Sequence, residues 1–437
     1  MRTSTRAPER AAGQDHVRGQ VRDQVRGQVR GLVRDRVRGQ VRERGDACPG
    51  ALRLHSADDG GLARLRLPTG VLTGRQLSVL ADAADRLGDG GLGITSRGNI
   101  DLRGLPDDCG TALAELLDEA GLLPSAAHER IRNMVVSPLA GIDGRAYGDA
   151  HVWARELDAL LCAEAWTTAL SGRFLFAVDD GRGDVAGLGG DVTLLAEPDG
   201  RALVRIGGAD RARSWRVSGA DAPRAALAAA EAFLAAAREA GNGAWRMAEL
   251  PAGQSIEVNV TEYLERAGVA AEATAPGTLP VGAPPEPGVI ADRAVSVVAP
   301  LGRVTTAQAR ALLPAPDDEV RVTPWRGFVL PGFADRAAAG ARLAELDEAG
   351  FLTRTGSPWL GVSACTGRPG CGKALADVRE DARPLEHGLP VHWSGCARRC
   401  GHPQGDWVDV LATADGTYDI TVRTTGSTGS TGSTATA

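Results

Sequence analysis

The chain has 437 residues, 43% of them hydrophobic, and a formal net charge of −6. This length and composition predict several globular units with sizeable cores, and the negative charge argues against general nucleic-acid binding. Because no apolar run reaches membrane-spanning length and no export signal is recognised, the sequence predicts a cytoplasmic protein without membrane attachment.

Residues 1–45 have a different composition from the rest. A Val-Arg pair recurs every four residues from Val17 to Val41, interrupted by several glycines. Since glycine weakens a helix and no partner face exists to bury the valines, we expect a disordered or marginally helical basic extension. An arm that binds a nucleic acid or a protein partner is the alternative.

The first globular unit is expected over residues 46–119. A helix capped by Thr73 and ending near Leu87 is predicted from its apolar face. The order β-α-β-β-α suits a small α+β half-domain. The predicted elements are strand 62–67, helix 73–87, strands 92–95 and 100–102, and a second helix around 113–117.

A tight Ser-Arg-Gly-Asn turn follows the second of these strands and can aim Arg97 into a cleft. Arginine is suited to hold carboxylates because its planar fork donates two parallel hydrogen bonds. Asn99 is a weaker candidate from the same turn, and Arg103 is expected at the surface.

The same pattern returns in the second half of the chain. Residues 300–305 parallel 68–73, Gln308 matches Gln76, and Thr323 corresponds to Thr95. A repeat of this length predicts a duplicated architecture with pseudo-two-fold symmetry. Arg326 lies in the counterpart of the Arg97 turn and is a further candidate carboxylate ligand.

The richest segment is 358–406, where four cysteines form two pairs. Five residues separate Cys365 from Cys371 and three separate Cys396 from Cys400, with glycines beside both pairs. Clustered thiolates favour a soft metal, and glycine lets the backbone wrap a cluster closely. A four-iron cluster is the main interpretation; zinc, which prefers tighter pairs, and four unrelated thiols are the alternatives. His392 and His402 flank the second pair and could ligate a mononuclear iron or only hydrogen-bond near the cluster.

The cysteine pattern resembles the cluster-binding motif of the sulfite and nitrite reductase haemoprotein superfamily, and within it the chain most resembles the precorrin-3B synthases. The resemblance implies an α+β fold with a duplicated architecture: two ferredoxin-like half-domains and two sulfite-reductase-haemoprotein-like α/β domains. The expected units are 1–45 (basic extension), 46–119 (first half-domain), 120–270 (first catalytic domain), 271–287 (linker), 288–350 (second half-domain), 351–425 (cluster domain) and 426–437 (flexible tail).

The resemblance also implies an activity. It is the oxygen-dependent conversion of precorrin-3A to precorrin-3B, a monooxygenase reaction of aerobic cobalamin biosynthesis that hydroxylates C20 and closes a γ-lactone. The implied partners are precorrin-3A, dioxygen and an external electron donor, either an NADH-linked reductase or a ferredoxin. The implied cofactors are a 4Fe-4S cluster held by Cys365, Cys371, Cys396 and Cys400 and, less directly, a mononuclear non-haem iron.

Further substrate ligands follow from the resemblance: Arg132 and Asn133 at the opening of the first catalytic domain, and Arg173 on a following strand. In sulfite reductases the last place carries Lys-Phe-Lys, whereas this chain has Arg173 and Leu175. Leucine cannot attract an oxyanion, which weakens the first alternative, a sirohaem-dependent sulfite or nitrite reductase. The second alternative is a non-catalytic iron–sulfur electron carrier. The residues leave the catalytic groups themselves undefined.

Overall fold

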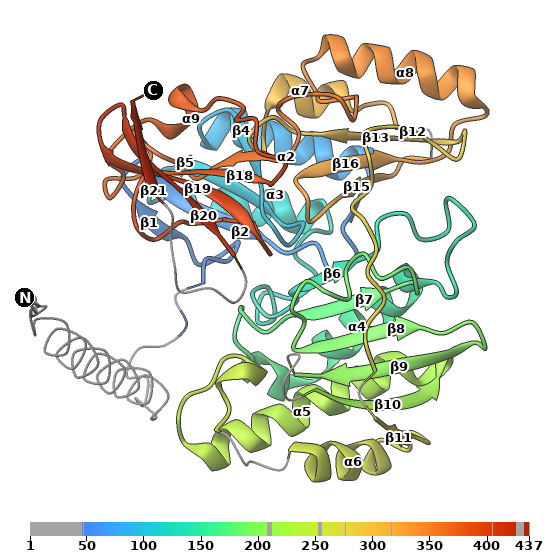
Figure 1. The fold of residues 1–437 in the computed structure, drawn as a ribbon. Coiled ribbons are helices and arrows are strands. Elements are labelled where there is room, and N and C mark those ends of the chain that lie inside the picture. Colours follow the sequence, from blue (N-terminus) through green and yellow to red (C-terminus); the bar gives the residue numbers. More distant parts are fainter. Residues whose placement is uncertain are drawn as a thin grey trace, which may run out of the picture.

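The computed structural model describes residues 46, 48–207, 212–251, 256–275, 277–315, 317–403, 405–424 and 432–436. The predicted basic extension 1–45 lies outside the described residues. The described part contains four sheets, which Figure 1 shows as an upper layer of three sheets above a separate lower domain. No helix in the described ranges is both long and apolar enough to cross a membrane.

The first sheet has the strand order β1-β2-β5-β4-β14. Its helix α2 begins after Thr73, as predicted, because the Thr73 side chain accepts the Gln76 N–H and the Gln76 side chain accepts the Thr73 N–H. This reciprocal pair is a capping box. The elements are β1 (His55–Ala57), β2 (Gly60–Leu65), α2 (Gly74–Leu87), β4 (Gly91–Ile94), β5 (Ile100–Leu105), α3 (Gly110–Glu119) and β14 (Arg303–Thr305).

The second sheet repeats this design with the order β12-β13-β16-β15-β3. Thr305 and Gln308 form the matching capping box at the start of α7. The elements are β3 (Val71–Leu72), β12 (Gly288–Ile290), β13 (Ala294–Val298), α7 (Thr306–Ala311), β15 (Val320–Val322), β16 (Gly327–Leu330) and α8 (Arg336–Glu348).

The two half-domains exchange one strand each. β3 precedes α2 but pairs with β15, placing Leu72 opposite Val320, while β14 precedes α7 but pairs with β4, placing Val304 opposite Leu92. Buried residues of both units therefore form one hydrophobic core. The expected boundaries 46–119 and 288–350 describe the order of the chain, whereas each folded sheet includes a strand from the other half.

The middle domain is built on a six-stranded sheet with the order β11-β10-β9-β8-β7-β6. β6, β7 and β8 are parallel and the remaining pairs antiparallel. Its core is separate and includes the Ala-rich face of α5. The elements are β6 (Met134–Val136), α4 (Ala150–Ala163), β7 (Phe176–Asp179), β8 (Val192–Ala196), β9 (Arg201–Ile206), β10 (Arg213–Ser218), α5 (Ala222–Ala240), α6 (Ile256–Arg266) and β11 (Glu272–Thr274). β11 occupies the start of the segment expected as a linker.

The last domain carries the cysteines on a sheet ordered β17-β18-β19-β20-β21. β17, β18 and β19 run parallel. The elements are β17 (Val362–Ala364), α9 (Val378–Asp381), β18 (Val391–Ser394), β19 (Trp407–Ala414), β20 (Thr417–Arg423) and β21 (Gly432–Thr436). Within the segment expected as a flexible tail, β21 pairs with the edge of β20.

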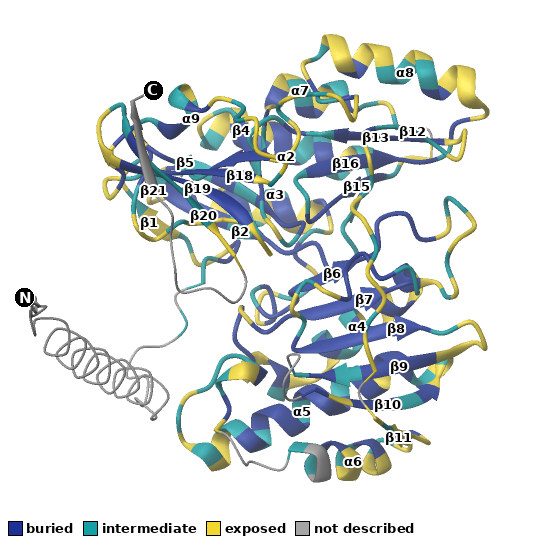
Figure 2. Ribbon diagram, in the orientation of Figure 1, coloured by how far each residue is buried: buried dark blue, intermediate teal, exposed yellow. Residues whose placement is uncertain are grey.

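Burial follows these layers: in Figure 2 dark blue marks inner strands such as β7, β8, β16 and β18, while the outer face of α8 is largely exposed. The α+β duplicated architecture predicted from the sequence is confirmed. In this architecture, the ends of the upper sheets and the edge of the middle domain surround a common space.

Candidate active site

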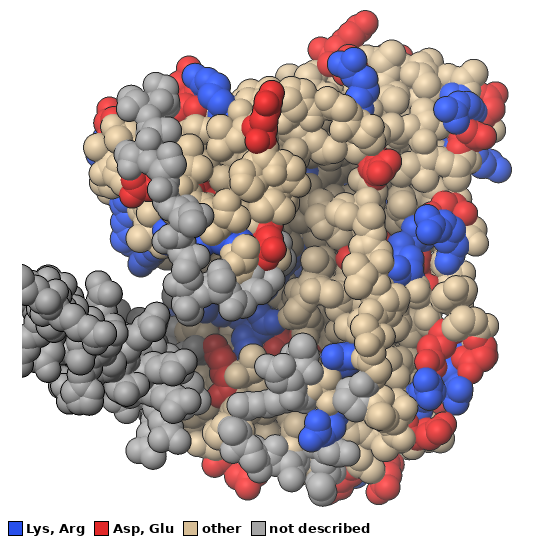
Figure 3. Space-filling view, in the orientation of Figure 1, with Lys and Arg blue, Asp and Glu red and all other residues tan. Residues whose placement is uncertain are grey.

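A cavity of about 440 Å³ lies where the four units meet. Its lining comes from the first half-domain, from residues 301–303 and Arg326 of the second, from Asn133 and Gly172 of the middle domain, and from the cysteine loops. Figure 3 shows basic side chains in the hollow between the upper layer and the middle domain. Since every unit contributes lining, the cavity exists only in the assembled fold.

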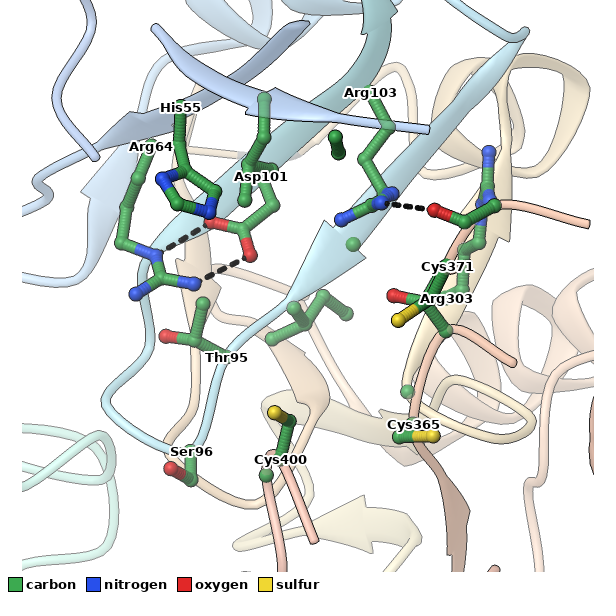
Figure 4. Close-up of a pocket in the computed structure, with 18 of the residues that line it drawn as sticks. His55, Arg64, Thr95, Ser96, Asp101, Arg103, Arg303, Cys365, Cys371 and Cys400 are labelled. Atoms are coloured by element: carbon green, nitrogen blue, oxygen red, sulfur yellow. Dashed lines mark hydrogen bonds and ion pairs between the residues drawn. The ribbon is translucent and has the colours of Figure 1, made fainter. Parts of the chain in front are cut away.

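The four cysteines predicted as metal ligands all line this cavity. Cys365 directly follows β17 and Cys396 closely follows β18, and these neighbouring strands are parallel. Their carboxyl ends therefore reach the same edge of the sheet, and the loops beyond them bring in Cys371 and Cys400. Figure 4 shows Cys365, Cys371 and Cys400 on this wall of the cavity.

The pKa values of two of these thiols, Cys365 and Cys400, are raised by burial and by neighbouring sulfurs. Burial raises the pKa of Cys365, and the N–H of Gly395, which donates to its sulfur at 3.2 Å, works in the opposite direction. Burial also raises the pKa of Cys400, and the nearby sulfur of Cys396 adds to the rise. A bound cation would reverse this preference by stabilising the thiolates.

The spread of the sulfurs bears on which metal group fits. A tetrahedral zinc site holds each sulfur about 2.3 Å from the metal, so its sulfurs lie within about 4 Å of one another. Among the described residues, no three of these cysteines gather their sulfurs within 4.8 Å. Four thiols around one cavity, spaced more widely than zinc requires and supplied with an amide donor, fit a polynuclear iron–sulfur cluster.

The Cys371 loop is tied to the first half-domain on both sides. The Asp58 carboxylate accepts the N–H of Gly372 at 2.6 Å. Arg103 pairs with Asp59 at 2.8 Å. It also donates to the carbonyl of Gly370 at 2.9 Å, the bond drawn from Arg103 in Figure 4. The expectation that Arg103 is a surface residue is therefore wrong, because its side chain joins the half-domain to the cysteine loop.

Three arginines of the cavity have carboxylate partners. Arg64 makes a bidentate pair with Asp101 at 2.7 and 2.8 Å (Figure 4), Arg103 pairs with Asp59, and Arg303 reaches Asp89 at 2.5 Å. Their charges are compensated within the protein, so they shape the walls more than they attract an anion.

Besides the exposed Arg398, four arginines of the lining have no carboxylate partner among the described residues: Arg66, which is buried, and Arg97, Arg326 and Arg379, which are half-buried. Burial lowers the pKa of each of them to about 10. Arg66 donates to the carbonyls of Arg130 and Gly172, and Arg326 to that of Gly401, while Nε of Arg379 has no partner. Buried cations in excess are costly unless an anion joins them, so this cavity is electrostatically built for a polyanion.

Arg326 occupies an unusual position for an arginine. Its backbone is left-handed, with φ at +60°, and its side chain crosses Gly302, where an added Cβ would lie 2.2 Å from Arg326 Cδ. Non-glycine residues held in this conformation concentrate at functional sites. The second half-domain thus directs one cation across to the loop after Cys400.

The structure brings four of the six predicted substrate ligands to the cavity: Arg97, Asn99, Asn133 and Arg326. Asn99 and Asn133 are hydrogen-bonded to each other at 3.2 Å. Arg132 and Arg173 are outside the lining. Arg132 is held by Asp158 in two 2.6 Å bonds, and Arg173 stacks over Trp245 at 5.0 Å. Leu175 is buried in an apolar cluster with Val135.

Sequence reasoning missed several lining residues, namely Arg64, Arg66, Arg303, Lys373 and Arg379. Arg64 and Arg66 lie two positions apart on and just after β2, a spacing that places both on one face of a strand. That alternation is the signal in the sequence that could have found both arginines.

Among the described residues, neither histidine near the cysteines is placed at the cavity, where a second, mononuclear iron would be needed. His392 is fully buried, with Nδ1 beside the Ser363 hydroxyl at 2.8 Å and Nε2 beside the Cys400 carbonyl at 3.1 Å, so both nitrogens are engaged. His402 stacks on Trp407, and neither histidine lines the cavity. In the described part of the chain, the tight metal-type grouping is Asp179, Asp180 and Asp184, away from the cavity lining.

Comparison with known proteins agrees with this geometry. The nitrite/sulfite reductase ferredoxin-like half-domain model matches residues 55–120. A ferredoxin–nitrite reductase from Synechococcus elongatus is 26% identical over 382 residues, covering 78% of this chain and 74% of the relative. The NirA protein structure from Mycobacterium tuberculosis has a TM-score of 0.61 at 18% identity, covering 88% of this chain and 78% of that one.

The chain therefore shares the fold and the half-domain signature of the nitrite and sulfite reductase superfamily, as its cysteine pattern predicts. Within this class it is also similar to a precorrin-3B synthase from a Sinorhizobium species, at 26% identity over 397 residues, covering 87% of this chain and 83% of the relative. The resemblance to both groups is confirmed, and the relatives named here are oxidoreductases.

Proposed function

We propose that this protein is a tetrapyrrole-modifying oxidoreductase that converts precorrin-3A to precorrin-3B. The observation that carries the proposal is a set of four buried or half-buried arginines, for which the described residues supply no carboxylate partner, in a cavity that four cysteines also line. A reduced tetrapyrrole with acetate and propionate arms supplies the missing anions. An electron-transfer protein without a substrate has no use for such a cavity.

The residues would divide the work between binding and positioning. Arg97 and Arg326 come from corresponding turns of the two half-domains, so they can grip carboxylates on opposite sides of one macrocycle. The Asn99–Asn133 pair offers amide groups between them. Fixing several arms at once determines which meso carbon faces the reacting oxygen.

The four cysteines would hold a 4Fe-4S cluster, which when bound supplies single electrons to the cavity. Gly395 donates to Cys365, and Gly372 is held by Asp58, so the loops that present the thiolates are anchored before the cluster arrives. Because no dinucleotide fingerprint occurs in the sequence, electrons would come from an external donor, such as an NADH-linked reductase or a ferredoxin. Dioxygen would be the oxidant.

A sirohaem-dependent nitrite reductase is the second candidate, because nitrite reductases match this chain at the same identity as the synthase. Leu175 favours the synthase. Its side chain lies in an apolar cluster, at the position where the resemblance to sulfite reductases implies an oxyanion-binding lysine. Arg173, which stacks over Trp245, is likewise outside the cavity lining.

The experiment that separates them uses anaerobically reconstituted protein. With precorrin-3A, a reductant and air, we expect a hydroxy-lactone product whose formation stops without oxygen, while nitrite and sulfite leave the reductant unoxidised. Strong sirohaem absorption bands together with nitrite-dependent oxidation of the reductant would overturn the proposal. A Cys371→Ser variant should lose the cluster absorption, whereas Cys109→Ser, at a buried thiol outside the cavity lining, should keep it.

A further inference from the structure

The chain contains a single lysine among its 49 basic side chains, Lys373, and this residue lines the cavity. All other cations of the lining are guanidinium groups. Lysine differs from arginine because its ammonium is a compact point charge with rotatable donors and can release a proton. The one lysine of the protein is therefore found beside Cys371, on the wall that carries the cysteines.

The backbone around Lys373 is fixed. The preceding Gly372 N–H is held by Asp58, and the carbonyl of Gly370 is held by Arg103. An added Cβ at Gly372 would lie 2.6 Å from the Asp58 carboxylate, so the loop packs closely on the first half-domain. The backbone position from which the Lys373 side chain extends is thus held by contacts on both sides of Cys371.

The amine itself is uncommitted. Asp58 and Asp59 are the carboxylates next to this loop, and they are engaged by the Gly372 N–H and by Arg103. No described carboxylate forms an ion pair with Lys373, and the residue is exposed at the rim. A flexible, solvated ammonium at the mouth of an arginine-lined cavity can meet an anionic arm that the buried arginines do not reach.

We propose that Lys373 is a ligand-contacting residue, whose ammonium binds a carboxylate arm of the tetrapyrrole at the rim beside Cys371. This inference rests on the proposed function, and it adds a positioning contact from the cysteine loop to those from the half-domains.

A single lysine permits a direct test. Reductive dimethylation of the full-length protein modifies only the α-amino group and Lys373, and mass spectrometry of peptides separates the two. The probe is uroporphyrin III, a stable polycarboxylate tetrapyrrole, and its binding is followed independently by absorbance. At ten times its Kd, a fully shielded amine reacts about tenfold more slowly, since only the free fraction is modified. We expect this slowing at Lys373 and an unchanged rate at the α-amino group.

Binding of the probe without any slowing at Lys373 would overturn this inference and leave the proposed function standing. Failure of the probe to bind at all would overturn both. The Lys373→Gln variant should bind the probe up to about fivefold more weakly, with the difference shrinking at high salt, as for an exposed ion pair. Lys373→Arg should retain the affinity. Arg336→Gln, at an exposed position on α8, serves as the charge-matched control and should have no effect.

Discussion

The substitution Arg97→Met should stabilise the ligand-free protein while weakening its hold on a tetrapyrrole. Burial lowers the pKa of Arg97 from the usual arginine value to about 10, and no described carboxylate forms an ion pair with it. Because the folded pKa is below the unfolded one, the charged side chain destabilises the fold at every pH below about 10. A lowering of this size corresponds to about 3 kcal/mol as an upper limit. Partial solvent access reduces this to roughly 1–2 kcal/mol.

Arg64→Met is the matched control, since Arg64 lines the same cavity but is paired with Asp101. Removing it leaves a partly buried carboxylate unpaired, which should destabilise the protein by about 1–3 kcal/mol. The assays are urea unfolding of the ligand-free variants and an absorbance titration with uroporphyrin III. We expect Arg97→Met to unfold at higher urea than the wild type and to bind the probe at least about tenfold more weakly. The reasoning is refuted if both variants are destabilised alike, because Arg97 would then be a compensated structural cation.

Three further changes test other parts of the structure. Burial raises the pKa of Asp184 to about 7, so the free energy of unfolding falls as the pH rises from about 4 to 7. The Asp184→Asn variant should not show this fall. In urea unfolding it should be more stable than the wild type by on the order of 3 kcal/mol at pH 8 and little different at pH 4. Gly302→Ala places a Cβ against Arg326, at a position whose own φ is +73°, so it should lower the melting temperature and weaken uroporphyrin III binding. Unchanged affinity would show that Arg326 does not contact the ligand. Gln76→Ala and Gln308→Ala each remove a capping box and a hydrogen bond to the end of a neighbouring helix, so each should lower the free energy of unfolding by about 1 kcal/mol. If thermal denaturation shows that one variant is destabilised much more than the other, the pseudo-two-fold design is contradicted.

Much of the local structure was determined by the sequence alone. The Thr73–Gln76 and Thr305–Gln308 capping boxes, the apolar face of α2 and the Asp335 cap of α8 depend on residues three or four positions apart, so they can be read along the chain. The cysteine pairs were equally legible, because ligands on loops after parallel neighbouring strands keep a short spacing. The duplicated pattern even predicted that two arginine turns would correspond.

Tertiary structure decided which of the arginines remain available. Arg132 and Arg97 look alike in the sequence, yet Asp158 on α4 neutralises the first while no described carboxylate reaches the second. Arg103 was expected at the surface, but it joins Asp59 and the Cys371 loop, which lies more than 260 positions further along the chain. The exchange of β3 and β14 was likewise invisible, since both strands are too short to show which sheet they enter. Charge compensation and strand pairing depend on partners distant in the chain, and only the folded protein brings those partners together.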